Sequence, residues 1–473
     1  MKKLIASILC ACTISSLLVG CGSTSDQADQ AGDTTAETQT DAESEESTES
    51  TGDAKTNADA DHVINVWAFT DEVPGMIEKY KELHPDFDYD INTTIIATTD
   101  GAYQPALDQA LASGGADAPD IYCAEAAFVL KYTQGDASQY AAAYEDLGID
   151  VATMTKDADI AQYTMDIGTN PDGKLVALGY QATGGAFIYR RSIAKDVWGT
   201  DDPAEITKKV GPGWDQFYNA AAELKAKGYG IVSGDGDIWH AVENSSDKGW
   251  IVDGKLNIDP KREEFLDLSK KLKDNGYHND TQDWQDAWFA DMKGEGAQQI
   301  FGFFGPAWLI NYTLAPNCGG EKVGEGTYGD WAVCEPPIGF FWGGTWICGA
   351  IDSDNQDIVA DIMKVMTCNK DVAKAITEGE QDYTNNKAAI KELIDGGYTN
   401  AFLGGQDHLA LLTEAADKIS LENKLSAYDQ GCNEKFQGAM KDYFLGTVDS
   451  YEAALENFKK NITDLYGNLT CDF

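Results

Sequence analysis

Basic residues are scarce in this sequence. Its 473 residues contain 35 Lys and Arg against 79 Asp and Glu, which gives a formal net charge of −44 at pH 7. A chain with this balance repels nucleic acid phosphates and anionic lipid headgroups, so we expect neither as a partner. The same charge weakens the case for an anionic ligand, although acidity also serves simply to keep a protein soluble.

The motifs of common catalytic and cofactor sites are also missing. The five His are scattered without HExxH spacing, and neither a GxSxG elbow nor a Walker loop occurs. Gly324, Gly326 and Gly329 match GxGxxG, but no clear strand precedes them and no helix follows, so they indicate a loop. The Asp352-Ser353-Asp354 segment begins like a calcium loop but lacks the required Gly and Glu, which favours a surface turn. We therefore expect no metal and no other cofactor.

Long apolar runs are absent after residue 20. The apolar stretch Leu4–Val19 follows Met1-Lys2-Lys3 and is shorter than the ~20 residues that span a bilayer, so residues 1–20 are predicted to be a signal peptide. Its end, Leu18-Val19-Gly20-Cys21, resembles the lipobox of bacterial lipoproteins, in which the cysteine carries lipid. An ordinary secretory signal with an incidental cysteine is the alternative. We expect a lipid on Cys21 to hold the chain at a membrane surface.

Aromatic residues are missing from residues 21–61, which consist mainly of Ser, Thr, Ala, Asp, Glu and Gln with Lys55 as the one basic residue. Such a segment buries too little apolar surface to offset the entropy of ordering, so we expect a disordered acidic tether.

Cysteines show no CxxC pairing, which argues against a structural zinc site. Cys10 and Cys12 would leave with the signal peptide. The odd number that remains after Cys21 cannot all pair within one chain. A Cys318–Cys334 bridge and free thiols are both compatible with the sequence. The seven are Cys123, Cys318, Cys334, Cys348, Cys368, Cys432 and Cys471.

The periodicity after residue 62 alternates between strand and helix. Residues 63–69, 89–96 and 118–123 are predicted strands, and residues 76–83 and the segment from Thr98 to Leu111 have helical spacing. This order predicts a parallel sheet covered by helices. About 410 residues follow the tether, too many for one ordinary core, so we expect two lobes.

Short motifs along residues 62–473 occur in an order typical of one family. They are Val66-Trp67, Ala118-Pro119-Asp120-Ile121, Leu178-Gly179-Tyr180, Tyr189-Arg190-Arg191, Phe304-Gly305-Pro306-Ala307-Trp308, Glu335-Pro336-Pro337, Gly343-Gly344, Tyr443-Phe444-Leu445-Gly446 and Tyr451-Glu452-Ala453-Ala454-Leu455. In this order the chain resembles the extracellular solute-binding proteins of family 1, the maltose-binding-protein-like components of carbohydrate ABC importers. The lipobox and tether fit members from bacteria with a single membrane, where the binder is anchored on the outer face of the cytoplasmic membrane.

The resemblance implies an α/β, two-lobed periplasmic-binding-protein-like fold of type II. Each lobe is expected to be a mainly parallel sheet covered by helices, and a hinge that the chain crosses more than once joins them. The expected parts are residues 62–178 for the first part of lobe 1, 179–340 for the first part of lobe 2, 341–395 for the return to lobe 1 and the hinge, and 396–473 for a C-terminal helical part mainly in lobe 2. The family closes its lobes over a bound ligand.

The resemblance also implies a ligand and a site. A sugar presents flat C–H faces to aromatic rings and hydroxyls to Asp, Glu, Asn and Gln. Ligands bind beyond the carboxyl ends of parallel strands, so residues just after the strands are candidates. Helix capping is an equal alternative for Asp100, and core packing is the alternative for Trp239. The candidates are Phe69, Asp71, Glu72, Thr99, Asp100, Tyr103, Glu125, Gln181, Thr183, Asp235, Trp239, Trp308, Trp342 and Trp346.

We therefore expect a monomeric, non-enzymatic protein that captures an oligosaccharide and delivers it to ABC permease subunits in the membrane. Carboxylates beside tryptophan would also describe a secreted glycosidase, which needs an acid/base pair, but that class has no motif here. An ABC binder for a peptide or a polyamine is the other alternative.

Overall fold

The computed structural model describes residues 62–98 and 101–470. The predicted signal peptide, Cys21, the tether at 21–61, Thr99, Asp100 and Cys471 lie outside the described residues. Within the described ranges, no helix combines the length and the apolar character that crossing a membrane requires.

Five strands form the first sheet, in the order β2-β1-β3-β10-β4. β1 pairs in parallel with β2 and β3, and β10 runs antiparallel between β3 and β4. The first three strands confirm the predicted parallel unit, with α1 and α2 as its connecting helices. The bounds are β1 (Val63–Ala68), α1 (Glu72–Leu83), β2 (Asp90–Ile95), α2 (Tyr103–Ser113), β3 (Ile121–Glu125), β4 (Leu178–Gly179) and β10 (Thr345–Gly349).

The apolar spacing of α1 explains how this sheet is covered. Val73, Met76, Ile77 and Tyr80 are buried at i, i+3, i+4 and i+7, so they form one face of the helix. They share a core with Val66 of β1 and with residues of α13 (Gln356–Cys368). We call the first sheet with the helices packed on it the first lobe.

Three strands form the second sheet, in the order β8-β5-β9, and β5 pairs antiparallel with both neighbours. This differs from the mainly parallel sheet expected in each lobe. The reason lies in the chain path, because β5 (Ala186–Arg190) enters this sheet from β4 whereas β9 (Trp331–Cys334) leaves it toward β10. Adjacent entering and leaving strands must run in opposite directions. β8 is Gly302–Gly305.

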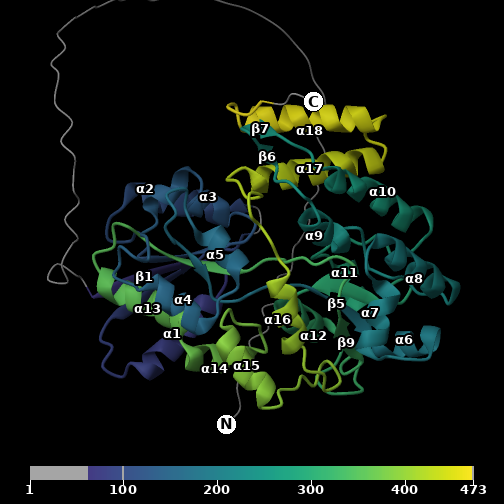
Figure 1. Ribbon diagram of the computed structural model, residues 1–473, viewed down its shortest axis with the longest axis horizontal. Coiled ribbons are helices and arrows are strands. Elements are labelled where there is room, and N and C mark those ends of the chain that lie inside the picture. Colours follow the sequence, from purple (N-terminus) through teal and green to yellow (C-terminus); the bar gives the residue numbers. More distant parts are fainter. Residues whose placement is uncertain (1–61, 99–100, 471–473) are drawn as a thin grey trace, which may run out of the picture. The chain divides into compact units, whose positions relative to one another are not determined.

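Helices from two distant parts of the chain share a core with the second sheet. Phe187 and Phe304 of the sheet contact Phe217 of α8, and Phe436 of α17 packs against Trp250. The C-terminal helices α17 and α18 lie side by side and near α10 (Figure 1). We call this sheet with these helices the second lobe. Their bounds are α8 (Trp214–Ala226), α9 (Gly236–Asn244), α10 (Pro260–Asp274), α17 (Asp429–Phe444) and α18 (Tyr451–Leu465).

The remaining elements are short helices and one hairpin. They are α3 (Val129–Thr133), the 3-10 turn η3 (Asp136–Tyr140), α4 (Val151–Ala158), α5 (Gln162–Gly168), α6 (Arg191–Trp198), α7 (Pro203–Val210), β6 (Ile251–Val252), β7 (Lys255–Leu256), α11 (Asp286–Lys293), the π-helical turn η4 (Leu309–Leu314), α12 (Ala315–Asn317), α14 (Lys370–Glu380), α15 (Lys387–Asp395) and α16 (Leu409–Asp417).

The chain passes between the two sheets in segments that pair with one another. Gly184 forms a bridge with Phe341, and the Thr183 hydroxyl donates to the Gly343 carbonyl at 2.7 Å. A Cβ on Gly185 would lie 2.1 Å from the Phe340 ring, so only glycine allows this close approach. These paired crossings form the hinge between the lobes.

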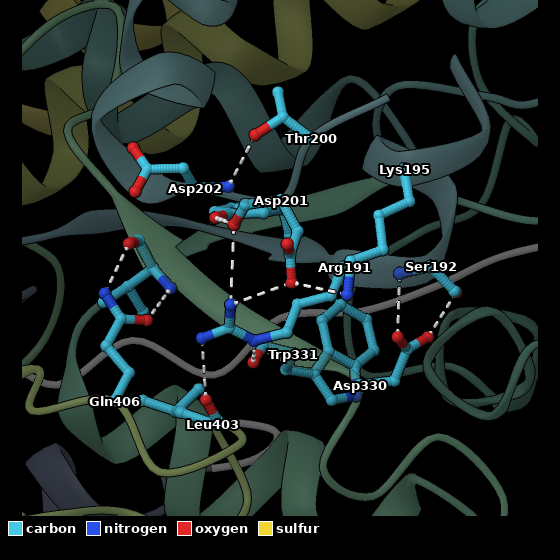
Figure 2. A network of polar contacts seen from close by, with 12 residues as sticks. Arg191, Ser192, Lys195, Thr200, Asp201, Asp202, Asp330, Trp331, Leu403 and Gln406 are labelled. Atoms are coloured by element: carbon cyan, nitrogen blue, oxygen red, sulfur yellow. Dashed lines mark hydrogen bonds and ion pairs between the residues drawn. The ribbon is translucent and has the colours of Figure 1, made fainter. Parts of the chain in front are cut away.

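An Arg191-centred network holds the loop before α16 to the edge of the second sheet (Figure 2). The Arg191 guanidinium donates to the carbonyls of Trp331 and Leu403, each at 3.0 Å, and contacts the Asp201 carboxylate at 3.2 Å. The Gln406 side chain accepts from the Val333 amide and donates to the Val333 carbonyl, both at 2.9 Å. Gln406 therefore satisfies the open edge of β9 much as another strand would.

The described residues include six cysteines, and Cys318 and Cys334 among them are free thiols. The bridge between these two, which the sequence left open, is therefore not formed. Five of the six are buried and pack as small apolar side chains.

Candidate ligand-binding cleft

A cavity of about 240 Å³ is lined by both lobes and by the hinge. The first lobe contributes Glu125 and the loop that follows β3, and the second contributes one face of α9 and one face of α17. Trp342 and Gly343 come from the hinge. Because the walls belong to parts that a hinge connects, a change in the angle between the lobes would open or close this cavity.

Glu125 stands at the carboxyl end of β3, where polar side chains of a parallel sheet meet a ligand. Its Oε2 atom accepts a hydrogen bond from the Ala127 amide at 2.8 Å. Burial raises the pKa of Glu125, an effect that the Ala127 amide and the charge of His240 oppose. His240 belongs to α9 of the second lobe, so the two lobes face each other here with polar groups.

Aromatic rings form one wall of the cleft. Trp342 stacks on His240 with ring centroids 4.8 Å apart and an interplanar angle of 24°. Trp342 also meets Trp284 edge-on at 6.2 Å and Trp308 edge-on at 4.8 Å. Trp308 donates from Nε1 to the Trp342 carbonyl at 2.9 Å. Trp308 in turn lies nearly parallel to Trp284, at 14° and 6.0 Å. We call Trp284, Trp308, Trp342 and His240 the aromatic wall.

Trp284 is unusual within this wall. Its side chain is 53% exposed, and its backbone has φ +66°, a conformation that bulky residues rarely adopt. The preceding Asp283 has a buried Oδ1 atom without a hydrogen-bond partner in the described part of the chain, and burial raises the pKa of Asp283 to about 6. Strain and unpaired polar atoms of this kind concentrate at functional sites.

Polar side chains of α9 and α17 line the cavity opposite Glu125. Asn433 donates from Nδ2 to the Glu243 carboxylate at 2.5 Å and accepts from the Trp250 indole at 2.7 Å. Arg262 lies over the Trp250 ring at 4.2 Å, and its Nε has no partner. Burial raises the pKa of Asp429 to about 7, although the Ser426 hydroxyl and the Arg262 charge oppose this.

A second polar group lies at the hinge, outside the cavity lining. Gln181 follows β4 and donates from Nε2 to Asp382 at 2.5 Å, and it bridges Thr384 through the backbone. Glu72 at the start of α1 belongs to the same group, because its pKa is raised first by burial and then by the charge of Asp382. Tyr180 and Tyr312 complete this set, which we call the hinge carboxylate group.

The sequence matches a family of proteins that bind solutes, as a cleft between two lobes would require. The family model of bacterial extracellular solute-binding proteins matches residues 75–399, well over half of the chain. The chain belongs to this family. No curated protein matches the sequence of this solute-binding protein significantly.

Solved structures with the same fold cover most of the solute-binding protein. An extracellular solute-binding protein of family 1 is 19% identical with a TM-score of 0.70, covering 85% of this chain and 99% of that one. The ABC transporter associated binding protein from B. animalis subsp. lactis Bl-04, in complex with beta-1,6-galactobiose, is 19% identical with a TM-score of 0.63, covering 87% and 100%. The sugar-binding protein MalE from Xanthomonas citri is 15% identical with a TM-score of 0.63, covering 85% and 97%. These likenesses show the two-lobed α/β fold.

Several predicted residues do come together at the cleft of the solute-binding protein. Glu125, Trp239 and Trp342 line the cavity. Trp308 stands beside them in the aromatic wall. Trp239 is nevertheless only 3% exposed and packs on Phe265 at 5.0 Å, so most of its ring serves the core of the second lobe.

Other predicted residues lie elsewhere. Tyr103 is fully buried and donates from its hydroxyl to the Cys123 carbonyl at 2.7 Å, and Trp346 is fully buried with its indole bonded to the Thr164 carbonyl at 3.0 Å. A side chain without exposed surface has no face for a ligand, so we assign both rings to the core. Thr183 is likewise buried, and its hydroxyl serves the hinge.

The remaining predicted residues that the structure describes lie outside the cavity lining. Phe69 is half-buried and meets Tyr103 edge-on at 5.8 Å, Asp71 is exposed at the start of α1, and Asp235 precedes α9 without a side-chain capping bond. Glu72 and Gln181 belong to the hinge carboxylate group. Thr99 and Asp100 lie outside the described residues.

Sequence reasoning missed several groups that line the cleft or its wall. Trp284 carries a visible signal, an aromatic beside Asp283 in a polar loop. His240 also had a signal, because it follows Trp239. The residues of α17 had none, because a C-terminal helix is brought to α9 only by tertiary packing. The missed residues are Trp284, Asp283, His240, Glu243, Arg262, Asp429 and Asn433.

Proposed function

We propose that this solute-binding protein captures an oligosaccharide between its lobes and delivers it to an ABC permease, without catalysing a reaction. The aromatic wall carries this proposal. Trp342 lines the cavity together with Glu125, Glu243 and Asn433, and Trp308 packs edge-on against it; an aromatic ring next to hydrogen-bonding oxygens is what a sugar requires. Two similar structures are described with beta-1,6-galactobiose and lacto-N-biose, which supports a sugar as the solute.

The proposal includes an anchor. Cys21 at the lipobox-like sequence would carry the lipid that holds the protein on the outer face of the cytoplasmic membrane, near the permease. Cys21→Ser should move the protein from the membrane fraction to the medium. A variant that stays in the membrane fraction would refute the anchor and leave the cleft proposal intact.

Ligand screening by thermal shift tests the binding function. A ligand that binds only the folded protein raises the free energy of unfolding by mass action, and Tm rises with it. At a ligand concentration of a hundred times Kd the gain is about 2.7 kcal/mol. We expect neutral or amine-bearing oligosaccharides to raise the Tm. A response to peptides alone would contradict the sugar proposal, and release of shorter sugars during the assay would indicate a glycosidase.

A further inference from the structure

The hinge carboxylate group gathers acidic and phenolic side chains from four segments. Glu72 begins α1, Asp382 lies between α14 and α15, and Tyr180 follows β4. Tyr312 belongs to the π-helical turn η4, which begins just after Trp308 of the aromatic wall. Asn311 of the same turn donates to the Gln381 carbonyl, which joins this turn to the segment that carries Asp382. The group therefore adjoins the wall on the hinge side.

Acidic side chains gather here, and among the described residues no cation contributes to the pKa shifts of Glu72, Asp382 or Tyr312. Burial and then the Asp382 carboxylate raise the pKa of Glu72 to about 7, and Asp71 adds to the effect. Burial also raises the pKa of Asp382 to about 6, in spite of hydrogen bonds from the Tyr383 amide and from Gln181. The charged neighbours that raise the pKa of Tyr312, after burial, are all acidic: Asp382, Glu72, Glu380 and Asp71.

Tyr180 provides an independent sign that a ligand binds here. Its ring is 1% exposed, and among the described residues its hydroxyl has no hydrogen-bond partner of ordinary geometry, although it lies beside Glu72 and Asp382. A buried hydroxyl without a partner is costly, typically by about 1–3 kcal/mol, so native proteins rarely leave one unpaired. Tyr312 is 39% exposed and Glu72 is half-buried, so the group has a face that a ligand can reach.

We propose that the hinge carboxylate group binds a positively charged amine of the solute, so that the captured sugar is an amine-bearing glycoside. The sugar part rests on the function proposed above. A neutral hydroxyl would donate one hydrogen bond and leave the two carboxylates repelling each other. An ammonium group donates three hydrogen bonds and supplies the missing charge. Among the described residues no set of three His, Cys, Asp or Glu is arranged to hold a metal ion, which favours the amine.

Sugars that differ only in N-acetylation provide the sharpest test. We would titrate the full-length protein at about pH 7.5, above the pKa values of both carboxylates, with D-glucosamine and N-acetyl-D-glucosamine at millimolar concentration, and with the dimers of each, following Tm and heat of binding. The free amines should bind about tenfold more tightly than the acetylated forms, a usual factor for a charge-assisted hydrogen bond. Equal affinity, or no response to either amine, would overturn the proposal.

Two variants locate the effect. Glu72→Gln and Asp382→Asn each remove one charge with little change in size, and each should abolish most of the amine preference while leaving the affinity for the acetylated sugars. Asp395→Asn is the matched control, because its carboxylate is exposed on α15 and pairs only with Lys391 in the described structure. A preference that survives in both hinge variants, or that also disappears in the control, would overturn the assignment.

Titrations with spermidine and with neutral oligosaccharides distinguish failure of the amine subsite from failure of the proposed sugar-binding function. Neutral oligosaccharides that bind without any amine preference would leave the sugar function standing and refute the amine subsite. Spermidine that binds in a Glu72-dependent way, with no sugar binding at all, would support the amine subsite and refute the sugar function.

Discussion

Trp342→Ala and Trp346→Ala each remove one indole ring, at positions four residues apart, and should impair different properties of the protein. Both tryptophans flank Gly343 and Gly344, whose positive φ values of +68° and +120° turn the chain between them. Trp342 lines the cavity and Trp346 lies in the core. We expect the first substitution to reduce ligand affinity and the second to reduce stability.

The cost of Trp346→Ala follows from its burial. The ring is 0% exposed, and truncating a buried aromatic in this way costs about 3–5 kcal/mol. The substitution also leaves the buried Thr164 carbonyl without the indole donor at 3.0 Å, which adds about 1 kcal/mol or more. For a lobe of 150–250 residues each kcal/mol lowers Tm by roughly 2–4 °C, so the total loss is on the order of 10 °C or more.

Trp342→Ala should lower the free energy of unfolding less than Trp346→Ala does, because Trp342 makes its structural hydrogen bonds through its backbone. Its amide donates to the Thr183 carbonyl at 3.2 Å and its carbonyl accepts from Trp308, and alanine keeps both. The substitution removes three ring contacts, to His240, Trp308 and Trp284, each worth about 0.5–1.5 kcal/mol. A stacked sugar would lose a contact of similar size, which weakens binding by about tenfold.

Urea unfolding and calorimetric titration with a ligand found by screening measure the two effects separately. We expect Trp342→Ala to keep most of its stability and lose affinity. Trp346→Ala should unfold at much lower urea and bind normally where it is still folded. Normal affinity in Trp342→Ala would refute its role in the cleft, and near-normal stability in Trp346→Ala would refute its place in the core.

Three further predictions follow from charges and thiols. Burial raises the pKa of Asp429 to about 7 and of Asp283 to about 6, above the usual 3.8. The folded state therefore binds these protons more tightly, and this stabilisation is complete below about pH 3.8 and is lost as the pH rises through 6 and 7. Tm should fall between about pH 4 and about pH 7 and should fall less in Asp429→Asn; an unchanged slope in that variant would count against the assignment. Arg190→Ala should cost about 1.5–3 kcal/mol in urea unfolding because it removes a largely buried guanidinium and the 2.7 Å partner of the half-buried Asp330, which keeps its bonds from Ser192. Lys391→Ala, which breaks an exposed pair, should cost under about 1 kcal/mol, and equal losses would contradict this difference. Cys318→Ser should leave the response of Tm to reductant unchanged because Cys318 and Cys334 are free thiols; a response to reductant that disappears in this variant would reveal a bridge between them.

The first sheet was predictable because its signals are local. The strand and helix periods in residues 63–125 are short, and a parallel connection leaves few alternatives for their arrangement. The direction of β5 and β9 was not predictable in this way. It depends on where the chain enters and leaves the second lobe, and the partners β5 and β9 are more than 140 residues apart in sequence.

The cleft was predictable in part. Glu125 follows from its position after β3, and Trp308 follows from its place after Gly305-Pro306. Trp342 and Trp346 flank the same glycines and have the same local signal, so only packing tells them apart. Asn433 and Asp429 reach the cavity from a helix nearly 190 residues beyond α9, which no local pattern indicates.

Calorimetric titration of an oligosaccharide into the purified protein, repeated with Trp342→Ala, decides whether the cleft is a sugar site. We expect one site per chain, a negative heat-capacity change from burial of the sugar faces on the aromatic wall, and a weaker constant in the variant. A folded protein that gives no heat with any neutral or amine-bearing oligosaccharide would contradict sugar capture.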